Sequence, residues 1–216
     1  MSRAGFGHDG AITEAKEKWM RIGILGAGAI GTAVATRLLA GGHEVVLSNS
    51  RGPQSLADTV AGLGPGASAG SREEAAAAEL VVLAVPGDRT AQALDGLGDW
   101  NGRILVDATN LYTTTPPDPR QETSSEANAR LAPGARVIKA FNHLFAATLA
   151  ADPRQGEGNR VLFVSGDNAE AKKMFADLLT GLGFAPIDLG GLADGGRLHQ
   201  VPAGPLVGQD LLRLSA

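Results

Sequence analysis

The sequence predicts an α/β fold built on a doubly wound, mostly parallel sheet with a small C-terminal extension. Short apolar runs alternate with segments of helical spacing along most of the chain, which is the pattern of a sheet covered by helices on both faces. The 30 glycines among 216 residues predict many tight connections between these elements. A hydrophobic fraction of 44% and a charged fraction of 19% are typical of a globular domain with a substantial core.

The first half of the chain reads as a series of strands and helices. An apolar strand at 21–25 leads into a helix in which Ile30, Val34 and Leu38 share one face, and two glycines end that helix at 41–42. The other elements expected here are strands at 44–47, 80–85 and 104–107, a helix at 55–63 after Pro53, a capping box of Ser71 and Glu74, and a helix at 90–97.

The second half begins with a long polar loop that contains TTTPPDP. A loop of this length is a candidate lid or partner surface, although a simple surface insertion explains it equally well. The elements expected beyond it are helices at 125–131 and 169–179, the latter capped by Asp167, and strands at 136–140, 160–165 and 184–188. We therefore divide the chain into a disordered or non-native extension at 1–19, a nucleotide-binding domain at 20–188, and a tail or helical segment at 189–216.

Composition also narrows the class of partner. A net charge of −4 with no run of Lys and Arg argues against nucleic acid. No stretch approaches the roughly 20 apolar residues that cross a bilayer, and the first residues lack the apolar centre of a signal peptide. The chain has no cysteine, and no His or carboxylate pair has metal-ligand spacing. We expect a cytoplasmic protein without a metal site.

The clearest motif is Gly26-x-Gly28-x-x-Gly31, which follows a strand and opens a helix. In this context the pattern is typical of a Rossmann-type dinucleotide site, where the glycines allow a tight turn, close approach of a pyrophosphate, and close helix packing. The free N–H groups of the helix N-terminus attract phosphate. The loop expected to contact the cofactor therefore comprises Gly26, Ala27, Gly28, Ala29, Ile30 and Gly31.

The end of the second strand indicates which dinucleotide binds. An acidic residue there would bond the ribose 2′-hydroxyl and repel a 2′-phosphate, but the strand ends in Ser48, Asn49, Ser50 and Arg51. Hydroxyl groups and a guanidinium can make charge-assisted hydrogen bonds to phosphate oxygens. We therefore expect NADP(H) rather than NAD(H), with Asn49, Ser50 and Arg51 as contacts, unless Arg51 is only a solvated loop charge.

These motifs extend into a family resemblance. The opening IGILGAGAIGTAVATRLLAGGHEVVLSNSRGP, followed by LVVLAVP, VDATN, VIKAFNH and RVLFVSGD, resembles the F420-dependent NADP oxidoreductase family from Met20 to the tail. Relatives of that family include the NADPH-binding portion of membrane ferric reductases. The resemblance implies that Ala84, Val85 and Pro86 lie beside the adenosine and nicotinamide ribose, and that Ala140, Phe141 and Asn142 border the nicotinamide.

Other polar residues are weaker candidates. Asn110 follows a strand at the edge where open α/β sheets bind ligands, although helix capping would also explain it. His143 could face an acceptor but is more readily explained as structural, and Lys139 could touch a substrate, reach solvent or pair with a carboxylate. We assign no catalytic residue, because hydride transfer between cofactors depends mainly on stacking and orientation.

The leading hypothesis is an oxidoreductase that transfers hydride between NADPH and a flavin-like or deazaflavin (F420) acceptor. The alternatives are a non-enzymatic NADP(H)-sensing module and an NADPH-dependent reductase of a small carbonyl, an imine or a ferric chelate. An imine-type reductase usually needs a long helical substrate domain, for which too few residues follow 140. Leucines at 206, 211, 212 and 214 predict a homodimer, unless they close the core of their own chain.

Overall fold

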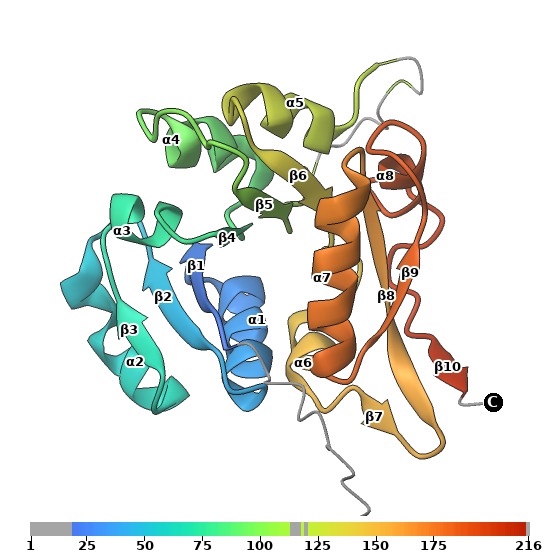
Figure 1. Cartoon of the computed structure of the whole chain (residues 1–216), viewed down its shortest axis with the longest axis horizontal. Coiled ribbons are helices and arrows are strands. Elements are labelled where there is room, and N and C mark those ends of the chain that lie inside the picture. The colour runs from blue at the N-terminus through green and yellow to red at the C-terminus, as the bar shows by residue number, and fades with distance from the viewer. Residues whose placement is uncertain (1–18, 113–117, 119–120, 215–216) are drawn as a thin grey trace, which may run out of the picture.

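The computed structural model describes residues 19–112, 118 and 121–214. Its strands form one sheet in the order β10-β8-β6-β5-β4-β1-β2-β3, with β7 and β9 also paired to β8 (Figure 1). The strands are β1 Arg21–Leu25, β2 Glu44–Ser48, β3 Ala67–Ala69, β4 Leu80–Leu83, β5 Ile104–Asp107, β6 Arg136–Lys139, β7 Arg154–Gln155, β8 Gly158–Gly166, β9 Ala185–Asp188 and β10 Leu212–Leu214.

Six of these strands form the parallel part of the sheet. The strands β3, β2, β1, β4, β5 and β6 are all parallel to their neighbours and follow the 3-2-1-4-5-6 order of doubly wound dinucleotide-binding folds. From β1 the chain adds β2 and then β3 on one side, and it then returns to the other side of β1 to add β4, β5 and β6. The strand order therefore reverses between β1 and β4, and the carboxyl ends of these two strands form the crevice where such folds bind ligands. The predicted α/β class and mostly parallel sheet are confirmed.

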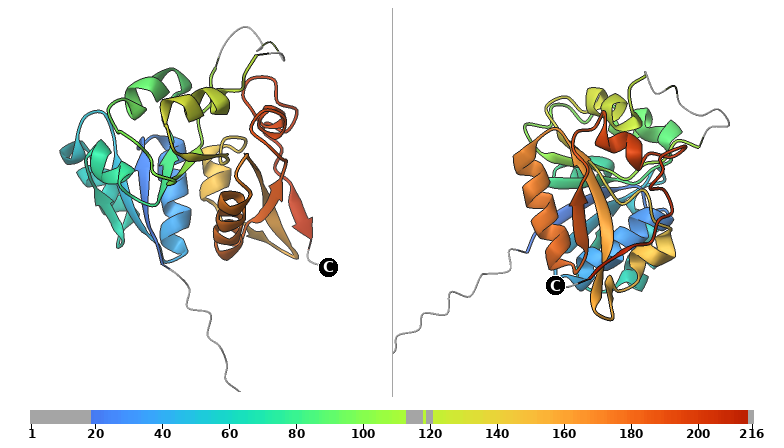
Figure 2. Two further views of the ribbon diagram at one scale, coloured as in Figure 1. Left: turned by 45° about the horizontal axis from the view of Figure 1, so that its top comes forward. Right: turned by 90° about the vertical axis from the view of Figure 1, so that its right-hand side faces the viewer.

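Helices cover both faces of this sheet (Figure 2). The helices are α1 Ala29–Ala40, α2 Ala57–Leu63, α3 Arg72–Ala76, α4 Thr90–Leu94, α5 Ser124–Leu131, α6 Ala146–Ala150, α7 Ala169–Gly181 and α8 Gly195–Leu198, with single 3-10 turns η1 Pro53–Leu56 and η2 Gly87–Arg89. Alternate residues of β1 point to opposite faces: Ile22 and Ile24 pack with α1 and α7, and Leu25 packs on the side of α3 and Trp100. The two resulting cores hold the crevice rigidly.

The remaining strands flank the parallel sheet on one side. Strand β8 runs antiparallel to β6, β9 pairs parallel with β8, and α7 packs against both β8 and β9 (Figure 1). The tail adds the short helix α8 and then the strand β10, which pairs antiparallel with β8. The sequence predicted a tail or helical segment and did not predict this edge strand.

One predicted helix cap is confirmed, and another is wrong. Ser71 and Glu74 make both bonds of a capping box at α3, as predicted. Asp167 was predicted to cap α7, but Asn168 is the N-cap and accepts the N–H of Ala171, because Asp167 instead accepts the N–H of Leu192 from the tail. The short strand β3 was not predicted, and the loop segments at 113–117 and 119–120 lie outside the described residues.

Candidate functional site

A cleft of about 720 Å³ lies at the carboxyl ends of β1, β2 and β4. It therefore occupies the crevice between β1 and β4 that the strand order predicts as a ligand site. Its lining combines the turn after β1, the loop after β2, the start of α3, and the segment from the end of β4 into α4. The lining residues are Leu25, Gly26, Ala27, Gly28, Ser48, Asn49, Ser50, Arg51, Arg72, Ala84, Val85, Pro86, Arg89, Gln92 and Ala93.

The three glycines of the motif serve different purposes in this cleft. Gly26 has φ +109°, and a Cβ on it would lie 2.4 Å from the carbonyl oxygen of Ala84. A Cβ on Gly31 would lie 1.9 Å from the carbonyl oxygen of Gly26, so both positions require glycine for folding. A Cβ on Gly28 would meet nothing within 4 Å, so this position faces open space that a pyrophosphate can occupy.

The N-terminus of α1 presents an uncapped anion site at the same place. Gly28 is the N-cap residue, no side chain caps the helix, and its first turn contains no acidic residue. The helix is 12 residues long, so its dipole and the N–H groups of its first turn favour a bound phosphate. The residues present therefore fit the pyrophosphate of a dinucleotide.

The loop after β2 is built around Asn49. Its Oδ1 accepts the backbone N–H of Arg51 at 2.9 Å, and its Nδ2 donates to the Ser55 hydroxyl at 2.9 Å. Ser55 in turn donates to the carbonyl of Gly52 at 2.8 Å. The side chain of Asn49 is thus engaged within the loop, which fixes the backbone that carries Ser50 and Arg51, both of them exposed.

Arg72 and Arg89 complete the cleft, and the sequence analysis did not single them out. Arg72 begins α3, and its Nη1 donates to the carbonyl of Gln92 at 2.9 Å, which ties α3 to α4. Its Nε and Nη2 donate to Oε1 of Glu73 at 3.1 and 3.0 Å. The backbone N–H of Glu73 itself and these bonds from Arg72 hold the pKa of the Glu73 carboxyl below its usual value.

A second group of predicted residues lies at the ends of β5 and β6 and does not line this cleft. Asn110 and Asn142 bond each other: Nδ2 of Asn110 donates to the Asn142 carbonyl at 2.9 Å, and Nδ2 of Asn142 donates to Oδ1 of Asn110 at 3.2 Å. The carbonyl of Asn110 also accepts the N–H of Gly87 at 3.1 Å, so Asn110 joins the loops after three strands rather than capping a helix.

Ala140 and Phe141 are also buried at this edge. Phe141 has φ +64°, which is a strained conformation for a bulky residue, and its ring packs edge-on against Phe175 with centroids 5.5 Å apart. The strain turns the chain sharply after β6, which orients Asn142 toward Asn110.

A fully buried ion pair lies beneath these loops. Nζ of Lys139 is 3.4 Å from Oδ2 of Asp107, and both side chains are completely inaccessible to solvent. Asp107 also accepts hydrogen bonds from the Thr109 backbone and hydroxyl at 2.9 and 2.6 Å and from the Ser125 hydroxyl at 2.5 Å. Burial alone would raise the pKa of Asp107, but the charge of Lys139 and these hydrogen bonds outweigh it and lower the pKa. Of the three roles considered for Lys139, pairing with a carboxylate is the one observed.

Two histidines lie buried next to this pair. The His143 ring stacks on Phe163 at 4.7 Å between centroids, and burial lowers its pKa to about 4, against the opposing effects of the Val161 backbone and Asp210. His199 is bonded to the Ser165 hydroxyl through Nε2 at 3.0 Å. Burial, with smaller effects of Lys139 and His143, lowers the pKa of His199 to about 3. Both rings are therefore neutral near pH 7.

Comparison with known proteins gives the family. Residues 21–111 match the family model described as "NADP oxidoreductase coenzyme F420-dependent". An Arthrobacter sp. FB24 protein named as a candidate F420-dependent NADP reductase is 32% identical, with a TM-score of 0.67, and the match covers 80% of this chain and 86% of that one. The chain belongs to the F420-dependent NADP oxidoreductase family. The matched residues 21–111 include the glycine loop and the strands β1 and β4 that form the crevice.

Two further relatives differ in the share of their length that this chain matches. A hypothetical protein from Sinorhizobium meliloti is 42% identical with a TM-score of 0.84, covering 92% of this chain and 98% of that one. Rat metalloreductase STEAP3 is 34% identical over 204 residues, which are 94% of this chain but 40% of STEAP3. The chain thus spans about two fifths of the length of that curated relative. Within the described residues, no helix combines the length and apolar character needed to cross a membrane.

More distant structures share only the fold. A reductive aminase from Aspergillus terreus is 21% identical with a TM-score of 0.63, and the match covers 85% of this chain and 59% of the aminase. About two fifths of the aminase therefore lies outside the matched fold.

Proposed function

We propose that this protein is an NADP(H)-dependent oxidoreductase that transfers hydride between NADPH and a flavin-like or deazaflavin ring. The observation that carries the proposal is the single cleft in which an open glycine loop faces an acid-free, arginine-bearing loop after β2. Family membership supports NADPH as the electron donor, and the family description, which names coenzyme F420, is what supports a ring acceptor in this proposal.

The residues of the cleft have separate roles in this proposal. The open face of Gly28 and the N-terminus of α1 receive the pyrophosphate, and Ser50 and Arg51 receive the 2′-phosphate. Ala84, Val85 and Pro86 form the apolar wall against the ribose and base. When bound, NADPH supplies the hydride, and the chain supplies binding and orientation.

The residues at the ends of β5 and β6 would then position the nicotinamide end. Asn110 and Asn142 fix each other across the two loops, and the buried Asp107–Lys139 pair supports them from below. Because the ion pair is fully buried and internally bonded, we assign it to positioning rather than to proton transfer. Ala140, Phe141 and Asn142 would border the ring that donates or accepts hydride.

The test is oxidation of NADPH by the purified protein, followed at 340 nm with F420, FMN, FAD or a ferric chelate as acceptor. We expect turnover with at least one ring acceptor and a strong preference for NADPH over NADH. Arg51→Gln should weaken NADPH binding about tenfold and leave NADH binding unchanged, since it removes one charge-assisted contact to the 2′-phosphate. Absence of NADPH binding would overturn the proposal.

The same experiment separates the other candidates. NADPH binding without turnover, together with NADPH-dependent association with another protein, would indicate a regulatory module. Reduction of the ferric chelate without an added flavin would indicate a metal reductase, the activity named for STEAP3. Reduction of a small carbonyl or imine would indicate the activity named for the reductive aminase.

A homodimer remains part of the proposal. Leu211, Leu212 and Leu214 are substantially exposed along the edge strand β10, whereas Leu206 packs against the apolar cluster of Val161 and Phe163. The exposed three are the residues available to a second copy. Sedimentation at micromolar concentration should show a dimer, and Leu214→Lys should shift it toward monomer.

A further inference from the structure

Arg72 enters the nucleotide cleft from an element that the glycine motif does not include. It is the first residue of α3, yet it lines the cleft beside Gln92 and Ala93 of α4. Helix α3 packs against β1 and β2, and the bond from Arg72 to the Gln92 carbonyl bridges to α4. This wall of the cleft lies apart from the Gly28 turn and is shared with Val85.

The guanidinium of Arg72 is fixed by hydrogen bonds from the N–H groups along its edges. Three of its N–H groups are engaged: Nε and Nη2 with Oε1 of Glu73, and Nη1 with the Gln92 carbonyl. Two acceptors on different sides of a planar group fix the orientation of its plane. Its side chain keeps 36% of its exposure. With three of its five N–H groups engaged, we take the flat face as the main surface left for a ligand. Guanidinium faces stack on aromatic rings, and this preference is stronger for Arg than for Lys.

The other two arginines of the cleft are held differently. Among the described residues, the side chain of Arg51 makes no hydrogen bond or ion pair. Arg89 makes only a long contact of 3.9 Å with Asp88, and both of those side chains are well exposed. The N–H groups of these two guanidiniums are therefore available to bind phosphate oxygens, whereas three of the five N–H groups of Arg72 already donate hydrogen bonds within the protein.

We propose that Arg72 is the platform on which the adenine ring of the dinucleotide stacks. The inference rests on the proposed function, since it takes the cleft to bind NADPH. With the pyrophosphate at Gly28 and the 2′-phosphate at Arg51, the wall formed by Arg72, Gln92 and Ala93 is left for the base. Adenine is a flat, uncharged ring, and it fits a wall that offers a guanidinium face and a methyl group.

The experiment measures affinity of the purified protein by calorimetry, with NADPH, NADH and 5′-AMP as separate ligands. Arg72→Ala should weaken all three about tenfold and leave the ratio of NADPH to NADH affinity unchanged. Arg72→Lys keeps the charge but loses the plane, so it should weaken them nearly as much. Nicotinamide mononucleotide, which lacks adenine, should bind the variants and the parent protein alike.

Glu73→Ala is the second variant. It keeps Arg72 but releases the edge held by Oε1, and we expect a loss of about threefold for the same adenine ligands. Thermal unfolding of each variant without ligand shows whether the variant is still folded, which is needed because Arg72 also bonds α3 to α4. If Arg72→Ala does not fold, Arg72→Lys and Glu73→Ala carry the test.

The outcomes separate this inference from the proposed function. If Arg72→Lys binds all ligands like the parent, or if only NADPH affinity falls in the Arg72 variants, Arg72 is not a stacking platform and the inference is overturned. The second result would make Arg72 a phosphate ligand. If the parent protein itself binds no NADPH, it is the proposed function that fails.

Discussion

The two halves of the crevice are built in opposite ways. Around the nucleotide cleft, the polar groups are exposed and several have no partner within the described residues, as for the side chain of Arg51 and the capping site at Gly28. At the ends of β5 and β6, the polar groups are buried and many are bonded to one another, as in Asp107 with Lys139, although Asn142 Oδ1 has no hydrogen-bond partner among the described residues. The first half keeps its hydrogen-bonding capacity for a ligand, and the second uses it to hold loops in place.

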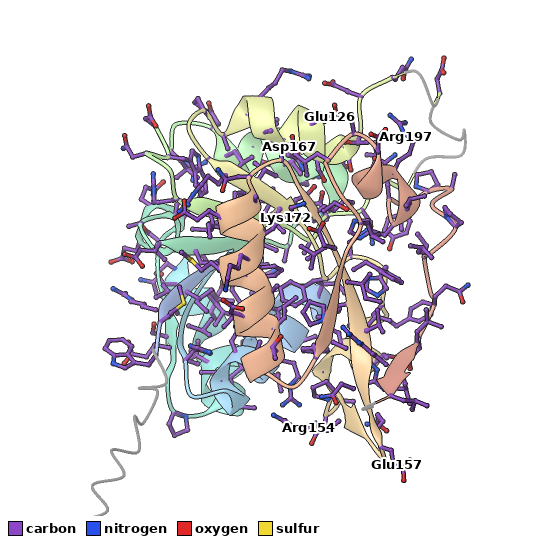
Figure 3. All side chains as sticks on the ribbon, turned by 45° about the vertical axis from the view of Figure 1, so that its right-hand side comes forward. Glu126, Arg154, Glu157, Asp167, Lys172 and Arg197 are labelled. Carbon is purple, nitrogen blue, oxygen red and sulfur yellow. The ribbon has the colours of Figure 1, made fainter. Side chains whose placement is uncertain are left out.

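Charged side chains on the outer elements, including α7, give a further comparison with the cleft. In Figure 3, the labelled charged side chains Glu126, Arg154, Glu157 and Arg197 project from the outer elements, while Asp167 and Lys172 lie at the top of α7. Lys172 bonds Asp188 of β9 at 2.9 Å, and Asp167 holds the tail through the N–H of Leu192. These contacts fasten the outer layer to the sheet. In contrast to these fastened side chains, Ser50 and Arg51 remain exposed at the cleft.

The largest expected effect comes from removing one partner of the buried ion pair at the ends of β5 and β6. Lys139→Met should lower the free energy of unfolding by about 3–5 kcal/mol, because it leaves the Asp107 carboxylate buried without its partner charge. Urea unfolding at fixed protein concentration measures the loss. Lys173→Met is the matched control, since Lys173 forms an exposed i,i+4 pair with Asp177 at 2.7 Å. Its effect should stay within about 0.5 kcal/mol, and equal losses for both variants would contradict the assignment.

The next effect is a loss of stability in mild acid. His143 and His199 have pKa values of about 4 and about 3 in the folded protein, below the value of 6.5 expected when unfolded. The unfolded state therefore binds protons first as the pH falls below 6.5, and stability decreases until the folded pKa values are reached. Near pH 5 each histidine should cost about 2 kcal/mol.

Chemical unfolding between pH 7.5 and 5 measures this slope, above the range in which carboxylates take up protons. His143→Phe keeps a ring against Phe163 and removes one titrating group, so it should flatten the profile. An unchanged slope in that variant would show that His143 is not protected from protons in the folded state.

The third prediction concerns the open half and affects binding rather than folding. Gly28→Ala should weaken NADPH about tenfold, because its methyl group would occupy the space left for the pyrophosphate. The unfolding free energy should change by less than about 1 kcal/mol, since that methyl group meets no protein atom. Calorimetry gives the affinity. Gly62→Ala, in α2 and equally open, is the control and should leave NADPH binding unchanged.

The sequence allowed prediction of features whose cause lies within a few residues. The glycine turn, the capping box at Ser71 and the acid-free end of β2 each follow from local chemistry. The turn and the end of β2, together with Ala84, Val85 and Pro86 from the family resemblance, account for most of the cleft lining. Arg72 and Arg89 escaped notice because neither belongs to the glycine motif or to the loop after β2: Arg72 reaches the cleft from α3, where it bonds the Gln92 carbonyl of α4, and Arg89 lies in η2. Asp167 failed as a helix cap for a similar reason, since a tail residue 25 positions away takes its carboxylate.

The smallest expected effect tests how Asn49 contributes. The sequence predicted a direct contact with the cofactor, whereas the structure shows both ends of its amide bonded to Arg51 and Ser55. If Asn49 acts by ordering the loop, Asn49→Ala should weaken NADPH only two- to fivefold, in keeping with the modest value of exposed hydrogen bonds. Ser55→Ala should have a similar effect, because it removes the other side of the same interaction.

The double variant distinguishes the two roles. When two residues act through one shared hydrogen bond, the combined loss of NADPH affinity should be close to the larger single loss rather than to their product. A direct contact would instead make Asn49→Ala severe and Ser55→Ala silent. Because the loop carries Arg51, an ordering role also requires that NADPH be weakened more than NADH in both single variants. Equal weakening of the two dinucleotides would therefore favour a direct contact of the Asn49 amide with a part of the cofactor that both dinucleotides share.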